Sequence, residues 1–213
     1  MRKINKREEP NSLTTWKRRN PNATYDDLDQ TNPAIRQDIR NACLEEQFYL
    51  CAYCCQRITG DLDSKNEHVE ARKIAPQRSL DFSNIVASCR SKRQCDAAHG
   101  SQPLPLTPLM DECETEFKFK ISGRVEGLTA QAKTSIQVLN LGDAEYLNRT
   151  LIEKRKQLSD ALLFANGVEP NNQLEDEDLV QMVIDDIQRP KDGKLEPFAP
   201  VVANILRGWL AAV

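Results

Sequence analysis

The sequence lacks any apolar run long enough to cross a membrane, and it has only two histidines in 213 residues. A spanning helix needs about 18 or more consecutive apolar residues, so we expect no contact with the bilayer. The basic start, MRKINKREEP, has no apolar segment behind it, and this excludes a secretory signal. No internal repeat or low-complexity segment is present. These absences favour a cytoplasmic globular protein.

The charge balance also excludes one class of protein. A net charge of −3 does not suit a uniformly basic nucleic-acid coat protein. Residues 1–110 hold 17 basic and 14 acidic side chains, whereas residues 111–213 hold 12 and 18. Any contact with phosphate is therefore expected in the first half of the chain.

The seven cysteines are an odd number in a chain without an export signal, which favours metal binding over disulfides. Cys51 and Cys54 form a CxxC pair, and Cys89 and Cys95 form a second, wider pair. Two separated pairs are typical of a tetrahedral zinc site, which would tie together a loop that has little core of its own. Cys55 is not among the predicted zinc ligands, because its side chain should point away from the zinc ion if the adjacent Cys54 binds that ion.

Both histidines fall within or just after the cysteine-bounded stretch. Glu67 and His68 are adjacent, and neighbours on an extended strand point to opposite faces unless the strand bends. Asn84 follows later, and Asp96 and His99 are three residues apart, so on a helix they would share a face.

The chain divides into three expected parts. These are an N-terminal docking arm (1–33), a core with the cysteines and histidines (34–110), and a region with a β-hairpin and helices (111–213). Asn32 and Pro33 predict the start of a helix that runs to about residue 48. Alternating residues predict strands over 117–121 and 124–126. Helical spacing predicts helices over 130–139, 144–164, 174–187 and 200–213, with Glu153, Arg155 and Lys156 facing water.

Several motifs together resemble one known family. Cys51-x-x-Cys54, Glu67-His68, Pro76, Asn84, Cys89, Cys95 and His99-Gly100 resemble the HNH endonucleases with a ββα-metal fold. The phrases REEPNSLTTW, LCAYC, NEHVEARKIAP and LDFSNIVASC are similar to the HNH component of Septu-type and retron-associated phage-defence systems. The resemblance covers about residues 1–110. It implies an α+β fold, in which a small zinc-tied ββα-metal core carries an N-terminal arm and a mainly helical C-terminal region.

The resemblance also implies roles for particular residues. His68 matches the general base, which takes a proton from the attacking water. Glu67 matches a ligand of a catalytic Mg²⁺ or Mn²⁺ ion, and Asn84 matches the asparagine that holds the loop and orients the base. The third position of the motif, also a ligand of the catalytic ion, is open: Asp96 matches it by count from the last cysteine, and His99 matches it by residue type.

Six basic residues lie between the two histidines and can grip phosphates on either side of a cut: Arg72, Lys73, Arg78, Arg90, Lys92 and Arg93. The substrate implied is DNA, or a structured RNA such as tRNA. The partners implied are an ABC/SMC-like ATPase, with a retron reverse transcriptase and its reverse-transcribed DNA as further candidates. The alternative is a zinc-stabilised adaptor without catalysis, with Cys51, Cys54, Cys95 and His99 as zinc ligands.

Overall fold

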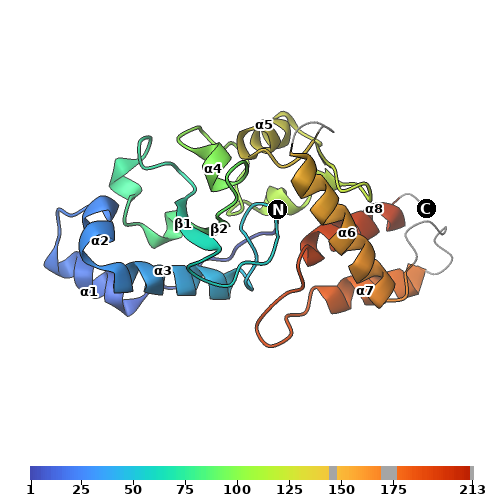
Figure 1. Ribbon diagram of the computed structural model, residues 1–213, viewed down its shortest axis with the longest axis horizontal. Helices are drawn as coiled ribbons and strands as arrows, with labels where there is room; N and C mark the ends of the chain where they lie inside the picture. Colours follow the sequence, from blue (N-terminus) through green and yellow to red (C-terminus); the bar gives the residue numbers. More distant parts are fainter. Residues whose placement is uncertain (144–147, 169–176, 212–213) are drawn as a thin grey trace.

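Two short antiparallel strand pairs and a set of helices make up the fold in the computed structural model, which describes residues 1–143, 148–168 and 177–211 (Figure 1). Strand β1 (Ser64–His68) pairs with β2 (Ile85–Cys89), and β3 (Phe117–Phe119) pairs with β4 (Val125–Gly127). The architecture is therefore α+β with small sheets, in agreement with the predicted class.

The N-terminal residues form three helices, α1 (Asn11–Arg19), α2 (Tyr25–Thr31) and α3 (Pro33–Glu46). A capping box between Thr24 and Asp27 starts α2. The backbone N–H of Thr24 donates to the carboxylate of Asp27, and the backbone N–H of Asp27 donates to the hydroxyl oxygen of Thr24. Helix α3 begins with a proline at its first position, as predicted. Leu13 and Leu28 of the predicted arm belong to the main hydrophobic cluster.

The central part of the chain consists of the β1–β2 pair, short turns and one short helix. Every residue of β2 is buried, and this strand packs against α3. Two 3-10 helices, η1 (Pro76–Arg78) and η2 (Phe82–Asn84), lie between the strands, and helix α4 (Asp96–His99) follows them. The chain thus passes through two antiparallel strands and then a short helix, which is the order that the resemblance implies.

The C-terminal part follows the predicted order closely. After η3 (Asp111–Glu114) and the β3–β4 hairpin come α5 (Ala130–Leu139), α6 (Arg149–Ala165), α7 (Glu177–Ile187) and α8 (Ala199–Leu210). Residues 144–147, 174–176 and 212–213 of the predicted helices lie outside the described residues. A second hydrophobic cluster joins α7 to α8, which makes the apolar stripe of the last helix part of the core.

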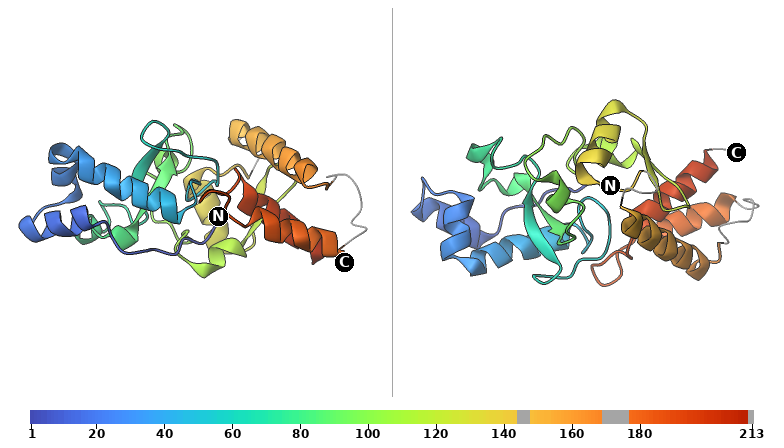
Figure 2. Two further views of the ribbon diagram at one scale, coloured as in Figure 1. Left: turned by 90° about the horizontal axis from the view of Figure 1, so that it is seen from below. Right: turned by 45° about the horizontal axis from the view of Figure 1, so that its top comes forward.

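The arrangement in space places the strands between two groups of helices. Helices α1–α3 lie at one end and α6–α8 at the other, with β1, β2, α4 and α5 between them (Figures 1 and 2). No helix in the described ranges is long and apolar enough to span a bilayer.

The burial of Arg155 on α6 differs from the prediction. Arg155 was expected on the water-facing side of its helix, but it is completely buried. Arg155 follows Leu151 by four residues and Ile152 by three, so it lies on the buried face of α6, where the β3–β4 turn and the segment after α5 contact the guanidinium group.

Candidate functional site: a four-cysteine cluster beside a carboxylate and histidine cluster

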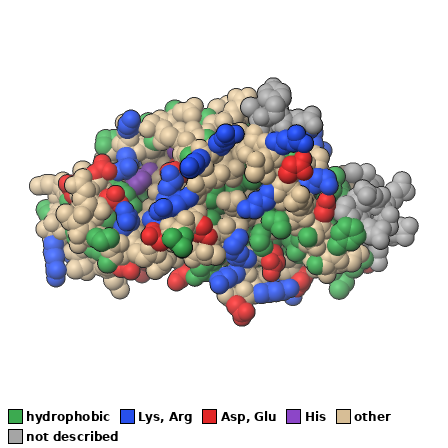
Figure 3. All heavy atoms as spheres, viewed as in Figure 1, with side chains coloured by type: hydrophobic (Ala, Val, Ile, Leu, Met, Phe, Trp, Pro, Cys, Tyr) green, Lys and Arg blue, Asp and Glu red, His purple; other side chains and the backbone are tan. Residues whose placement is uncertain are grey.

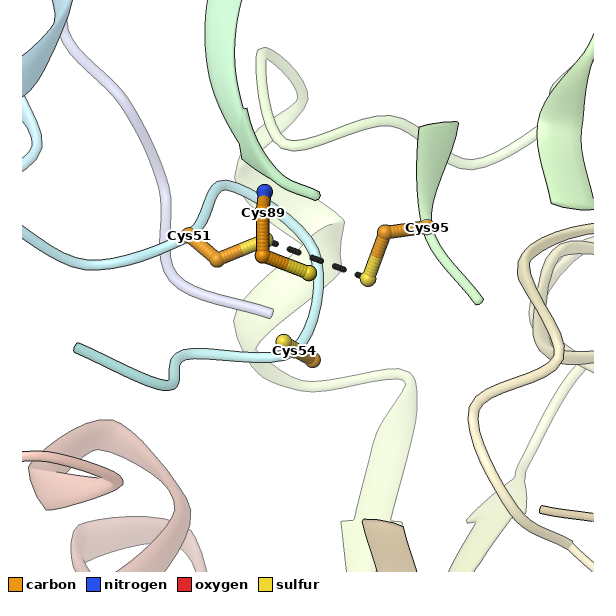
Figure 4. Close-up of side chains that lie close together, drawn as sticks. All are labelled: Cys51, Cys54, Cys89 and Cys95. Carbon is orange, nitrogen blue, oxygen red and sulfur yellow. Dashed lines mark hydrogen bonds between the residues drawn. The ribbon is translucent and has the colours of Figure 1, made fainter. Parts of the chain in front are cut away.

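Four cysteines meet in the interior of the central region, as the two predicted pairs require. The Sγ atoms of Cys51, Cys54, Cys89 and Cys95 all lie within 4.8 Å of one another, and all four side chains are buried (Figure 4). A tetrahedral zinc ion with Zn–S bonds of about 2.3 Å needs sulfur atoms about 3.8 Å apart. The Sγ atoms of Cys51 and Cys95 are 3.8 Å apart. This cluster can therefore hold a metal ion such as zinc.

The local backbone structure positions each of these thiols in the cluster. Cys51 and Cys54 lie in a tight turn closed by the hydrogen bond from Cys55 N to Cys51 O (3.1 Å). Cys89 ends strand β2, and its backbone N–H donates to Cys51 Sγ (3.3 Å). Cys95 precedes α4 with a φ angle of 56°, which a residue with a side chain adopts only when its surroundings impose it.

The thiols are electrostatically linked. Burial raises the pKa of Cys54 well above its ordinary value, and the neighbouring thiol of Cys51 adds to this. Burial acts in the same sense on Cys51, but hydrogen bonds from the other three cysteines outweigh it and hold the pKa of Cys51 well below its ordinary value. Within the folded chain a thiolate is therefore favoured at Cys51 and disfavoured at Cys54.

The remaining cysteines lie outside this cluster, as the sequence predicted for Cys55. Cys55 is buried with a φ angle of 62° and is no member of the four. Cys43 is a buried thiol on α3, where burial raises its pKa to about 12. The adaptor hypothesis used His99 and not Cys89 as a zinc ligand, whereas the four groups that meet in this cluster are the thiols of Cys51, Cys54, Cys89 and Cys95.

A second cluster forms around the carboxyl group of Glu67. The His99 Nδ1 atom lies 2.5 Å from Glu67 Oε1, and the Tyr53 hydroxyl donates to the same oxygen (3.3 Å). His99 is fully buried, and its other ring nitrogen, Nε2, has no hydrogen-bond partner among the described residues. If Nδ1 carries the proton toward Glu67, then Nε2 presents a lone pair, as in a histidine that ligates a metal.

Asp96 completes this cluster. Burial raises the pKa of Glu67 well above its ordinary value, and a hydrogen bond and charge repulsion from Asp96 raise it further. Burial also disfavours the charged form of Asp96, but its hydrogen bonds to Glu67 and Lys65 prevail and lower its pKa. Within this pair the proton is therefore favoured on Glu67, and Asp96 forms a salt bridge with Lys65.

His68 contacts a different set of groups. Its Nε2 atom lies 2.8 Å from the backbone oxygen of Ser79, and its ring meets Tyr25 edge-on at a centroid distance of 4.8 Å. The residue is 6% exposed. No hydrogen bond among the described residues joins His68 to Glu67 or His99. Burial lowers its pKa, and the hydrogen bond to Ser79 opposes this shift.

Asn84 holds the turn that follows His68. Its Oδ1 atom accepts from Glu70 N (2.8 Å), and its Nδ2 group donates to Glu70 O (3.0 Å). The backbone oxygen of Asn84 accepts from Val69 N (2.9 Å). Asn84 therefore fixes the two residues directly after His68 and does not contact the imidazole itself.

The six basic residues between the histidines lie on two separate loops. Arg72 forms a salt bridge with Asp26, and Arg78 pairs with Glu70 and Asp81 at 2.9 Å. Arg90 donates from Nε to Ser64 O (3.0 Å). Lys73, Lys92 and Arg93 are exposed, and their side chains make no ion pair within the described part of the chain. Figure 3 shows Lys and Arg side chains gathered across one face, where a histidine side chain is also visible.

Three contacts of these clusters were not foreseen from the sequence: Tyr53 and Lys65 beside Glu67 and Asp96, and Tyr25 against His68. Tyr53 lies inside the Cys51–Cys54 turn, so its position in the CxxC pair was an available signal. Lys65 is two residues before Glu67 on the same strand and therefore on the same face. Tyr25 lies more than forty residues from His68 in the chain, and no sequence signal predicts their contact.

Comparison with known proteins gives one relevant similarity. No family model matches this sequence. An Escherichia coli protein named "Retron Ec83 putative HNH endonuclease" is 32% identical over 100 residues. The alignment covers 42% of this chain and 37% of that protein, so the chain spans well under half the length of the relative that it matches. The similarity supports a relationship to HNH nucleases associated with retrons.

Proposed function

We propose that this chain is a metal-dependent HNH-type endonuclease that hydrolyses phosphodiester bonds in nucleic acid, as the effector of an antiphage defence system. The observation that carries the proposal is the convergence of Glu67, Asp96 and His99 from β1 and α4. They meet next to a four-cysteine cluster, with His68 at the following position of β1. The curated relative supports the same chemistry through its printed name.

Glu67, Asp96 and His99 are the residues that would hold the catalytic cation. Carboxylate oxygens suit Mg²⁺ and Mn²⁺, and Mn²⁺ also accepts an imidazole nitrogen. The buried Nε2 atom of His99, which has no partner among the described residues, fits such a role. Bound there, the ion would neutralise charge that develops on the scissile phosphate and its leaving oxygen.

His68 has the protonation state that a general base needs. Because burial lowers its pKa, the imidazole is neutral at pH 7 and able to accept a proton. A backbone carbonyl can only accept a hydrogen bond, so the contact with Ser79 O requires the proton on Nε2. The lone pair is then on Nδ1, and this is the atom that would take the proton from water.

The substrate and partners belong to the proposal as well. The exposed Lys73, Lys92 and Arg93 offer contacts to phosphates of DNA or of a structured RNA such as tRNA. The sequence resemblance supports an ABC/SMC-like ATPase as the partner that restrains the nuclease. The relative's printed name supports a retron, with its reverse transcriptase and reverse-transcribed DNA, as a further partner.

One observation favours a second candidate, a zinc-stabilised adaptor without catalysis. His68 is almost fully buried, with Tyr25 against its ring and Ser79 at Nε2, as a structural histidine would be. In that case the binding of a partner, and not cleavage, would be the activity of the chain.

A cleavage assay separates these two functions. The full chain is incubated with duplex DNA and with a tRNA pool, with Mg²⁺ or Mn²⁺, alone and with the co-encoded partners. We expect the cation to trigger cleavage, and His68→Ala to reduce the rate by about 10²- to 10⁴-fold, the usual contribution of a general base. Zinc content and thermal stability are measured on the same samples. Unchanged biological activity of folded, zinc-containing His68→Ala would support the adaptor instead.

A further inference from the structure

The ring of Tyr25 packs against the imidazole that the proposed function assigns as the general base. The ring centroids of Tyr25 and His68 are 4.8 Å apart, and the ring planes meet at 87°. Both residues are buried, each with an exposed fraction of 6%. An edge-to-face pair is a favoured aromatic geometry, because the positive edge of one ring meets the negative face of the other. The contact therefore restrains the orientation of the His68 ring.

Polar contacts hold Tyr25 in place. Its hydroxyl oxygen accepts a hydrogen bond from Asn66 Nδ2 (2.8 Å). The same amide group donates to Arg36 O (3.0 Å), and its Oδ1 atom accepts from Arg40 Nε (3.3 Å). Asn66 and His68 are two residues apart on β1, so they share a face of the strand. The anchor of the tyrosine and the imidazole that the tyrosine contacts therefore belong to one strand face.

The start of α2 brings the tyrosine ring to this point. Tyr25 is the first residue of α2 and directly follows Thr24, which caps the helix. On the other side of the contact, Arg72 Cζ lies 5.3 Å from the Tyr25 ring centroid, and the guanidinium group pairs with Asp26. Helix α2, from the N-terminal part of the chain, thus supplies one wall of the space around the imidazole.

The two nitrogen atoms of the His68 ring have different surroundings. Nε2 lies 2.8 Å from Ser79 O, whereas Nδ1 makes no hydrogen bond within the described part of the chain. Nδ1 is not one of the fully enclosed side-chain nitrogens that lack a partner, so it keeps contact with solvent. Buried polar atoms with a purely structural role are as a rule hydrogen-bonded. The surroundings of His68 instead fix one nitrogen and leave the other open to water.

We propose that Tyr25 is a positioning residue for His68: its ring keeps the imidazole turned so that Nε2 meets Ser79 O and Nδ1 faces the attacking water. This inference rests on the proposed nuclease function, in which His68 is the general base. Without the tyrosine ring, the imidazole can turn about its Cβ–Cγ bond, and either nitrogen can then carry the proton. A displaced base costs rate, and a misplacement of 1 Å can cost about 100-fold.

NMR of the imidazole groups tests the positioning without reference to activity. The sequence has only two histidines, so long-range proton–nitrogen spectra of the full chain with isotope-labelled histidine contain two ring systems. His68→Ala assigns them. At a pH where the ring is neutral, we expect wild-type His68 to carry its proton on Nε2. Tyr25→Leu should show both tautomers of His68, whereas Tyr25→Phe keeps the ring and should match the wild type.

Cleavage kinetics on the same variants measure what the position contributes to the reaction. We expect Tyr25→Leu to lower kcat by about 10- to 100-fold with KM nearly unchanged, because only the base is displaced. Tyr25→Phe should stay within a few-fold of the wild type. Phe119→Leu is the matched control, since Phe119 is an aromatic residue with the same exposed fraction of 6% and lies on β3 against α8. It should lower stability without changing the His68 tautomer or kcat.

Two results would overturn the role of Tyr25 and leave the nuclease function intact, as long as His68→Ala abolishes cleavage. One is an unchanged His68 tautomer in Tyr25→Leu, and the other is a kcat that falls no further than in Phe119→Leu. Full cleavage by His68→Ala would overturn the proposed function itself, and the role of Tyr25 with it. Tyr25→Met fills more of the space left by the ring and replaces Tyr25→Leu in both measurements if that variant does not fold.

Discussion

The His99 Nδ1 atom and the Glu67 Oε1 atom lie 2.5 Å apart although the two residues are separated by 32 positions in the chain. Strand β1 supplies the carboxyl group and helix α4 supplies the imidazole. Cysteines of the four-cysteine cluster lie next to both elements, since Cys89 ends β2, the partner of β1, and Cys95 directly precedes α4. The candidate catalytic cluster therefore lies directly beside a group of cysteines that could hold a metal ion.

The choice between Asp96 and His99 as a ligand of the catalytic cation is open to a direct test. We expect His99→Ala to abolish cleavage at any concentration of Mn²⁺, because it removes a buried ring nitrogen that has no partner among the described residues. We expect Asp96→Asn to raise the Mn²⁺ concentration needed for half-maximal cleavage, because an amide keeps one oxygen but loses the charge. Cleavage rates over a Mn²⁺ titration measure both effects. The opposite ranking of the two variants would identify Asp96 as the essential ligand.

Replacement of Asn84 should loosen the turn after His68. Asn84→Ala leaves the backbone N–H and C=O of Glu70 without their partner, and we expect a loss of about 2 kcal/mol of unfolding free energy. Urea denaturation measures this loss. Asn22→Ala serves as the control, since Asn22 is exposed and should change stability by less than about 0.5 kcal/mol. Equal stability of the two variants would mean that Asn84 is not what fixes the turn.

Much of this architecture follows from local sequence patterns. The start of α3 at Pro33, the β3–β4 hairpin and the order of the C-terminal helices were predicted, because caps, alternation and helical spacing are local properties. The four-cysteine cluster was also predicted, because zinc-site spacing survives as a sequence signature even when the second pair is wide. The roles of His68, Asn84 and the cation ligands remain predictions.

Contacts between distant segments were not accessible in the same way. The burial of Arg155 depends on which surfaces cover α6, and the contact of Tyr25 with His68 depends on how α2 folds back. Neither segment carries a residue pattern that specifies its partner. A charged residue on a helix is assigned to water by default, and only a tertiary structure reveals that it is covered.

Removal of one cysteine of the cluster should unfold the central region, whereas removal of a cysteine outside it should not. We expect wild type and Cys113→Ala to contain one zinc per chain, and Cys51→Ala to lose zinc and its cooperative thermal transition. The physical reason is that metal binding supplies folding free energy, on the order of 10 kcal/mol in small zinc domains. Mass spectrometry of metals and thermal melts provide the measurements. Full zinc content in Cys51→Ala would remove Cys51 from the ligand set.

Exposed basic residues near the site should contribute to nucleic-acid affinity without affecting the fold. We expect Lys73→Ala and Arg93→Ala each to weaken binding and to reduce the salt slope of the affinity by about 1, as loss of one phosphate contact does. Lys156→Ala is the control, because Lys156 lies on α6 and pairs with Asp160. Fluorescence anisotropy over a range of salt concentrations measures the slopes. A larger effect in Lys156→Ala would place the nucleic acid on the helical side.

Asp63 should make stability depend on pH in acid. Burial disfavours its charged form, but the N–H groups of Gly60 and Thr59 outweigh this and lower its pKa below the ordinary value. The folded state therefore favours the carboxylate, so its stabilisation is present above the unfolded-state pKa of about 3.9 and disappears as the pH falls through the folded-state pKa. We expect Asp63→Asn to cost about 1 kcal/mol at pH 7 and progressively less below pH 4. Urea denaturation at several pH values measures the difference, and a gap that widens in acid would contradict this assignment.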